Sequence, residues 1–191
     1  MTVARDRPPV ITSVTPNAGQ QGKTVSVAVT GQFTHFSQAA TQVNFGAGIT
    51  VSNVVVSSAT SLTAQLEVTN TTVLGSRSLT VTTTLPDRRE VATLNNAFTV
   101  TPGTPVLTLI NPNTGKQGDT LTVQVSGQFT NFVQGTTVAN FGAGITASAP
   151  TVTTPTSLSV QLTIAAAALA GKRNVTMTTG MESPGPSEMN R

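Results

Sequence analysis

The sequence contains ITSVTPNAGQQGKTVSVAVTGQFTHFSQAATQVNFGAGIT at residues 11–50 and LTLINPNTGKQGDTLTVQVSGQFTNFVQGTTVANFGAGIT at residues 107–146. The two stretches align without a gap at an offset of 96 residues, and 23 of the 40 aligned positions are identical. A repeat of this length corresponds to a whole small domain and is too long for the unit of a solenoid. The repeat therefore predicts two copies of one domain in tandem.

Apolar and polar residues alternate with a period of two in each copy. The alternation is clear in Val25–Val29 and Leu62–Val68, and again in Leu121–Val125 and Leu158–Ile164. This pattern is typical of antiparallel strands with one packed face and one solvated face. Turn residues separate the runs and give seven expected strands in the first copy, near 9–15, 23–30, 41–46, 49–57, 61–68, 77–84 and 96–101. Seven short strands in one copy favour an immunoglobulin-like β-sandwich. We therefore predict an all-β chain of two tandem immunoglobulin-like β-sandwiches.

The composition agrees with an all-β chain and excludes several classes of site. Thr and Val, which favour strands over helices, make up 61 of the 191 residues. Because the chain has no Cys, it can form no disulfide, zinc–thiolate site or cysteine nucleophile. The net charge of +3 comes from ten basic and seven acidic residues, and Trp and Tyr are absent. A nucleic-acid groove needs a dense basic stripe with stacking aromatics, so we expect no nucleic-acid partner.

The repeat also sets the expected domain boundaries. We expect an N-terminal tail at 1–8, a first sandwich at 9–101, a proline-containing linker at 102–105, a second sandwich at 106–180 and a disordered tail at 181–191. The counterparts of Asn96–Val100 would be residues 192–196, and the tail Met181–Arg191 has two prolines and no apolar alternation. The second sandwich is therefore expected to be incomplete, to lack its last strand and to self-associate through the open sheet edge. This pattern also suggests a fragment or truncated gene product.

Several short motifs point to a known family. Ile11–Gly19 and Leu107–Gly115 carry the pattern Ile-x-x-Ile-x-Pro-x-x-Gly in conservative form. In the first copy a turn at Gly22–Thr24, a corner at Gly31–Phe33 and a strand end at Val43–Gly46 follow, and all three recur 96 residues later. Each copy resembles the IPT/TIG domain, the immunoglobulin-like module named for plexins and transcription factors. The departures are Gln21 and Gln117 in place of a turn glycine, and Ala139 in place of a valine.

The resemblance, in its microbial surface or extracellular type, implies a non-catalytic structural, adhesion or spacer module of an exported or surface protein. Such a module contacts a protein or glycan partner through loops and sheet edges. The alternatives are a carbohydrate-associated accessory module of an extracellular enzyme and a virion or phage surface decoration domain. We expect no enzymatic activity and no cofactor.

Met1–Val10 contains no apolar stretch for a signal peptide, and the apolar run Ile164–Gly171 is too short to cross a bilayer. We therefore expect no membrane insertion. The lack of a signal peptide leaves either a cytoplasmic protein or a piece whose export signal lies elsewhere, and the resemblance implies a location outside the cell or at its surface as part of a longer protein.

Few residues are candidates for chemistry. His35 is the single histidine, and Asn131 replaces it in the second copy, so we interpret it as an exposed loop residue. Asp87 and Glu90 bracket two arginines after Pro86, and we interpret this segment as a solvated hairpin tip. The acidic residues form no Asp-x-Asp pattern, so we predict no metal site. No catalytic or cofactor-binding residue is predicted.

The remaining motifs have structural explanations. Phe33, Phe36 and Phe45 recur as Phe129, Phe132 and Phe141, and we expect all six in the two cores. Gly46 and Gly48 are expected in a tight turn with positive φ. Ala165–Ala168 is expected to cross between the two sheets, not to form an interaction helix. Two segments, Asn70–Thr72 and Asn174–Thr176, match the N-glycosylation pattern as chance occurrences in an Asn- and Thr-rich chain.

Overall fold

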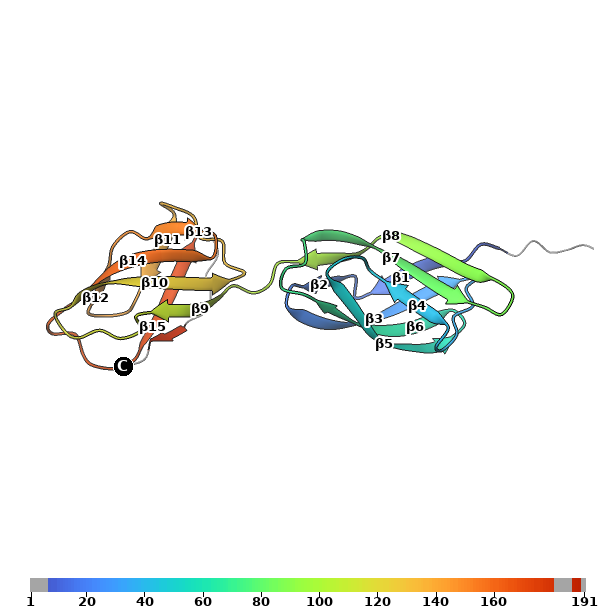
Figure 1. The fold of residues 1–191 in the computed structure, drawn as a ribbon, viewed down its shortest axis with the longest axis horizontal. Coiled ribbons are helices and arrows are strands. Elements are labelled where there is room, and N and C mark those ends of the chain that lie inside the picture. The colour runs from blue at the N-terminus through green and yellow to red at the C-terminus, as the bar shows by residue number, and fades with distance from the viewer. Residues whose placement is uncertain (1–6, 181–186, 190–191) are drawn as a thin grey trace, which may run out of the picture. The chain divides into compact units, whose positions relative to one another are not determined.

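The computed structural model describes residues 7–180 and 187–189. The chain divides into two compact units, residues 1–103 and 104–191, which are called domain 1 and domain 2. Within the described residues, every regular element is a β-strand (Figure 1). The all-β prediction and the two tandem β-sandwiches are thereby confirmed.

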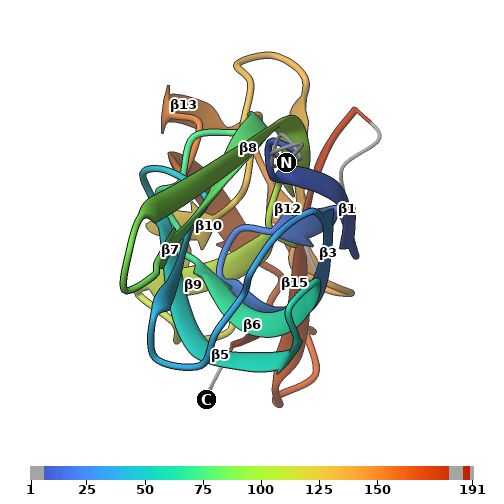
Figure 2. The ribbon, with the colours of Figure 1, turned by 90° about the vertical axis from the view of Figure 1, so that its right-hand side faces the viewer.

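Domain 1 consists of two four-stranded sheets. The first has the order β1 (Val10–Thr15), β3 (Lys23–Gln32), β6 (Ser61–Val68) and β5 (Ile49–Ser58). The second has the order β2 (Ala18–Gln20), β8 (Arg89–Thr101), β7 (Gly75–Thr84) and β4 (Thr41–Asn44). Figure 2 shows β5 beside β6 and β7 beside β8. All neighbours are antiparallel except β2 and β8, which are parallel.

The strands of domain 1 follow the sequence pattern with two differences. The sequence pattern does not predict the short strand β2, because its three residues show no apolar alternation. They form a strand through backbone pairing with the end of β8. Strand β8 begins at Arg89, seven residues earlier than expected. The inward residues of both sheets form one core, in which the side chains of Val29, Leu62, Leu66 and Leu79 are fully buried. Burial of each such side chain contributes about 1.5–3 kcal/mol.

Domain 2 repeats this arrangement with shorter strands. One sheet has the order β12 (Ile145–Ala147), β14 (Ser157–Ile164), β10 (Thr120–Gln128) and β9 (Val106–Asn111), and β13 (Thr151–Thr154) also pairs with β14. The other has the order β11 (Thr137–Asn140), β15 (Arg173–Thr179) and β16 (Ser187–Met189). Strands β12 and β13 correspond to the single strand β5. Pro150, at the position of Val54, lies in the gap between them and cannot donate a ladder hydrogen bond.

The prediction that the C-terminal tail cannot supply a strand is wrong for residues 187–189. Strand β16 pairs antiparallel with β15, with Met189 opposite Arg173. The edge of β15 presents backbone N–H and C=O groups, and an extended segment can satisfy them whatever its side-chain pattern. In domain 1 the residue opposite Arg77 is Phe98, so Met189 takes the register position of Phe98.

Strand β16 replaces part of β8, which is much longer. Strand β8 continues three residues past Phe98 to Thr101 and pairs there with β2. The counterpart of β2 in domain 2, residues 114–116, is not a strand within the described part of the chain. The rest of the expected disordered tail, residues 181–186 and 190–191, lies outside the described residues.

Polar residues that are identical in the two copies hold loops in place. The Nε2 amide of Gln21 donates to the carbonyl oxygen of Thr72 at 2.6 Å, and Gln117 donates to that of Ala168 at 2.7 Å. These glutamines, which depart from the IPT/TIG turn pattern, therefore fix the crossover that follows the sixth strand of domain 1 and its counterpart in domain 2. The crossover at 165–168 joins β14 to β15 in the other sheet, as predicted.

Gly46 and Gly48 have φ of 85° and 83°, as predicted. A Cβ at Gly48 would lie 2.7 Å from the Oγ1 atom of Thr72, so the tight turn also brings the backbone against the crossover.

Candidate functional site

Four of the six repeated phenylalanines lie in the cores as predicted, namely Phe36, Phe45, Phe132 and Phe141. The prediction is wrong for Phe33, whose side chain is 42% exposed, and for Phe129, which is half-buried. If the alternation of β3 and β10 continued past the ends of these strands, both side chains would point into the core. Both have φ of 58°, however, and this left-handed conformation interrupts the alternation. A bulky residue rarely adopts it, so the same conformation at both positions marks a defined corner at the end of the strand.

The corner in domain 1 is held from both sheets. The Oγ1 hydroxyl of Thr34 and the backbone N–H of Phe36 both donate to the carbonyl oxygen of Ala59, each at 2.9 Å. The backbone N–H of His35 donates to Oε1 of Glu90 at 2.9 Å. These bonds fix the residues that follow Phe33, and Phe33 itself is left on the surface.

Glu90 is not part of a solvated hairpin tip, and that prediction is wrong. Because β8 begins at Arg89, Glu90 lies in the strand opposite Thr83, and its side chain is 7% exposed. Its Oε2 atom lies 2.8 Å from Nδ1 of His35. Asp87 does lie exposed in the turn, as expected. His35 is 46% exposed, as expected for a loop residue, but its bond to Glu90 was not foreseen, because 55 residues separate the two.

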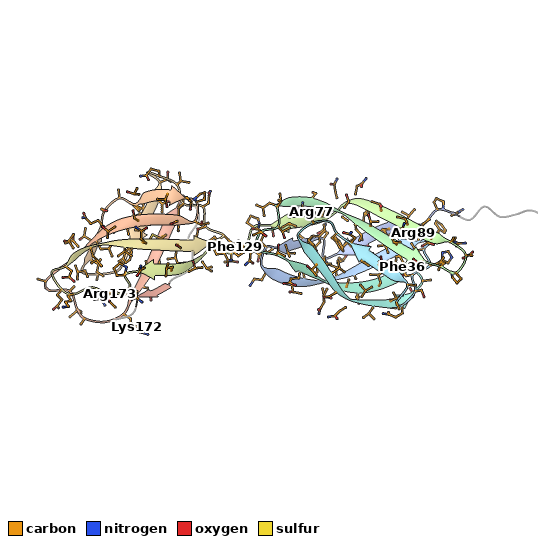
Figure 3. The ribbon with its side chains drawn as sticks, viewed as in Figure 1. Phe36, Arg77, Arg89, Phe129, Lys172 and Arg173 are labelled. Atoms are coloured by element: carbon orange, nitrogen blue, oxygen red, sulfur yellow. The ribbon has the colours of Figure 1, made fainter. Side chains whose placement is uncertain are left out.

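A shallow hollow of about 440 Å³ adjoins this corner. It is called the tip of domain 1, and its lining residues are Arg7, Pro8, Pro9, Phe33, Arg88, Arg89, Glu90 and Val91. The guanidinium carbon of Arg7 lies 5.0 Å from the centre of the Phe33 ring, which is a cation–π distance. Figure 3 shows Arg89 at this end of domain 1. The tip therefore presents an aromatic ring among guanidinium groups. Among the described residues that line the hollow, Glu90 is the one carboxylate, and it is bonded to His35.

A second hollow, of about 320 Å³, lies in domain 2 and is called the groove. Its lining residues are Gly115, Lys116, Gln117, Ile145, Ile164, Ala168, Leu169, Ala170, Gly171 and Arg173. Figure 3 labels Lys172 and Arg173 where the chain enters β15. The guanidinium of Arg173 donates to the carbonyl oxygen of Leu169 and so closes the loop before β15. Arg77 makes the equivalent bond to Val73 in domain 1.

The other sequence motifs form no site. Asn70 is exposed in the turn after β6, and Asn174 is exposed on β15. Within residues 7–180 and 187–189, no group of three His, Asp or Glu side chains is placed to hold a metal ion. The same residues include no helix long and apolar enough to cross a membrane.

Comparisons with known proteins assign the chain to no family. No protein-family model matches it. No curated protein matches it either. Among solved structures, it is similar to the adhesin FdeC of Escherichia coli, with 18% identity and a TM-score of 0.36 over 95% of this chain and 62% of FdeC. It is also similar to the plexin A4 extracellular region, with 16% identity and a TM-score of 0.39 over 94% of this chain and 18% of that one. A third similar structure is the Down syndrome cell adhesion molecule, with 12% identity and a TM-score of 0.45 over 96% of this chain and 27% of that one.

The chain thus spans less than two thirds of each of these proteins. The immunoglobulin-like assignment rests on the two packed sheets and their strand order. The narrower IPT/TIG assignment stays a prediction from the sequence motifs.

Proposed function

We propose that the chain is a non-catalytic adhesion or spacer module of an exported or surface protein, and that it binds a partner protein through the tip of domain 1. The observation that carries this proposal is the exposed ring of Phe33, which has a left-handed backbone and Arg7 stacked on its face. Nothing in the core of domain 1 requires a phenylalanine there. Phe129 has the same φ at the equivalent position of domain 2, which indicates that this corner is a regular feature of both copies.

The chemistry of the tip favours a protein partner with an acidic rim. Aromatic and arginine side chains dominate the binding energy of protein interfaces. The corner is already fixed through Ala59 and Glu90, so binding loses little conformational freedom. Arg7, Arg88 and Arg89 outnumber the two carboxylates beside them, which are Glu90 in the hollow and Asp87, paired with Arg88 at 3.8 Å. The excess of positive charge complements carboxylates around an apolar pocket on the partner.

Selection from a phage-displayed random peptide library against the whole chain tests this proposal without a known partner. We expect selected peptides to be rich in acidic and apolar residues. Their affinity should fall at least tenfold for Phe33→Ser and for Arg7→Ser, as is usual when an interface anchor is removed. The matched control is Val55→Ser, because Val55 is also an exposed apolar residue, on β5.

Three outcomes would overturn the proposal. The first is peptides that bind the Phe33→Ser variant as well as the parent chain. The second is binding of neutral polysaccharides alone, lost on Phe33→Ser, which would favour the carbohydrate-associated module. The third is hydrolytic turnover abolished by His35→Ala, which would show that the module is catalytic.

A further inference from the structure

Strand β5 is an edge strand of domain 1, and its sequence does little to keep another strand away. Among the described strands it ends the sheet β1-β3-β6-β5 (Figure 2). Its ten residues include no charged residue and no proline, and the side chain of Val55 is 55% exposed. A register shift between Ser52 and Val55 bends the strand without ending it. A long, uncharged edge of this kind is a template for a strand from another molecule.

The side chain of Gln38 covers the open side of β5 at Val55. Its Nε2 amide donates to the carbonyl oxygen of Val54 at 3.0 Å, and its Oε1 atom accepts from the backbone N–H of Val56 at 2.9 Å. A neighbouring strand that paired with β5 at Val55 would need the same two backbone groups. The amide of Gln38 therefore takes the place of one peptide group of such a neighbour.

The turn that carries Gln38 is fixed to the other sheet of domain 1. The backbone N–H of Ser37 donates to Oγ1 of Thr41 at 2.9 Å, and the N–H of Thr41 donates to the carbonyl oxygen of Ser37 at 3.0 Å. Thr41 is buried, and its hydroxyl oxygen lies 3.0 Å from that of Thr83 on β7. Because the backbone of the turn is already held, the two bonds to β5 have to order only the side chain of Gln38.

Domain 2 contains the same clamp. Gln134 donates to the carbonyl oxygen of Pro150 at 3.1 Å and accepts from the backbone N–H of Val152 at 2.8 Å. The hydroxyl of Thr137 accepts from the N–H of Val133 at 2.8 Å and closes the turn. The other three residues of this five-residue turn differ between the copies, whereas the glutamine and the threonine are identical. The identity thus falls on the two residues whose side chains make these bonds.

The two domains differ in the backbone that the clamp covers. Pro150 stands at the position of Val54 and has no N–H, so a neighbouring strand would find no donor there. The continuous strand β5 also corresponds to two short strands in domain 2, β12 and β13. The edge of domain 2 is therefore protected by the proline as well as by Gln134, whereas domain 1 relies on Gln38 at this point.

We propose that Gln38 is an edge guard, which keeps β5 of domain 1 from pairing with β5 of a second copy of the chain. The two groups that it covers are self-complementary. If Val55 lay opposite the same residue of a second copy in an antiparallel pair, the N–H of Val56 on each chain would donate to the carbonyl oxygen of Val54 on the other. The two exposed valines would form an apolar cross-strand pair, and the uncharged edges would not repel each other. The guard involves none of the residues of the tip and does not depend on the proposed function.

Sedimentation of the whole 191-residue chain over a range of concentrations tests the guard. Gln38→Ala and Gln38→Met both remove the two bonds to β5, and Met keeps the length of the side chain. We expect either variant to raise the self-association constant at least about tenfold over that of the parent chain, because two backbone groups become available in each copy. The matched control is Gln134→Ala, which removes the same bonds in domain 2. It should stay within about threefold of the parent chain, because Pro150 still lacks a donor.

A second substitution and one amide signal locate the contact. Val55→Lys, added to Gln38→Ala, should return association to the level of the parent chain, because it places two like charges opposite each other. The amide of Val56 should exchange faster in Gln38→Ala than in the parent chain at low concentration, and should regain protection as the concentration rises. A purely structural role of Gln38 would give fast exchange at every concentration.

The proposal would be overturned if neither Gln38→Ala nor Gln38→Met associated more strongly than the parent chain. Association that Val55→Lys left unchanged would also overturn it, because the contact would then lie away from the edge of β5. Equal association of Gln134→Ala would do the same, since the effect would then come from the loss of the turn and not from an exposed edge.

Discussion

The ring of Phe98 meets the ring of Phe45 edge-on, with centroids 5.6 Å apart and planes at 70°. Phe45 follows β4 and Phe98 belongs to β8, and both rings are fully buried. The pair joins the last strand of domain 1 to the turn at Gly46. The core of this domain therefore includes a ring contact between residues that are 53 positions apart in the sequence.

Phe45→Ala should lower the free energy of unfolding of domain 1 by about 3–5 kcal/mol, because it removes a large buried ring and leaves a cavity. Denaturant unfolding followed by the domain 1 amide signals measures this loss. A loss below about 1 kcal/mol would contradict the core position of Phe45.

Phe33→Gly should change the stability of domain 1 by no more than about 1 kcal/mol, since glycine adopts φ of 58° without strain and this gain offsets the loss of a ring that is only partly covered. Phe36→Ala is the matched control three residues away, and its buried ring should be worth about 3–5 kcal/mol. Thermal unfolding of the two variants makes the comparison. A large loss with Phe33→Gly would show that the exposed ring has a structural role.

Glu90→Ala should destabilise domain 1 by about 1–3 kcal/mol, because the backbone N–H of His35 loses its acceptor in a partly buried site. Asp87→Ala, in the exposed turn three residues earlier, should stay within about 0.5 kcal/mol of the parent chain. Denaturant unfolding and the amide shift of His35 report on both variants. Equal effects would mean that the His35–Glu90 contact does not hold the corner.

Gln117→Ala should destabilise domain 2 by about 1 kcal/mol and speed amide exchange in the 165–170 crossover, because its side chain holds Ala168. Gln124→Ala serves as the control, since Gln124 is exposed on β10. Unchanged exchange in the crossover of Gln117→Ala would refute this role. Gln21→Ala should act in the same way on the crossover at Thr72 in domain 1.

The sequence predicted well what depends on periodicity. The alternation in Val25–Val29 and Leu62–Val68 gave the strands and their buried faces, because side chains in a strand point alternately to its two sides. The same reasoning failed for Phe33, where one left-handed residue interrupts the period. It also missed β2, whose three residues form a strand through pairing with β8 and show no pattern of their own.

The sequence by itself determined that the chain is all-β, that one domain occurs twice, and which aliphatic residues form the two cores, because these properties follow from local pattern and from the repeat. The tertiary structure alone decided which distant residues meet. It placed Glu90 against His35, the ring of Phe98 on Gly19, and a groove at the equivalent end of domain 2. These relationships depend on the pairing of strands that are far apart along the chain, and strand register and strand ends are set by packing and backbone hydrogen bonding between sheets.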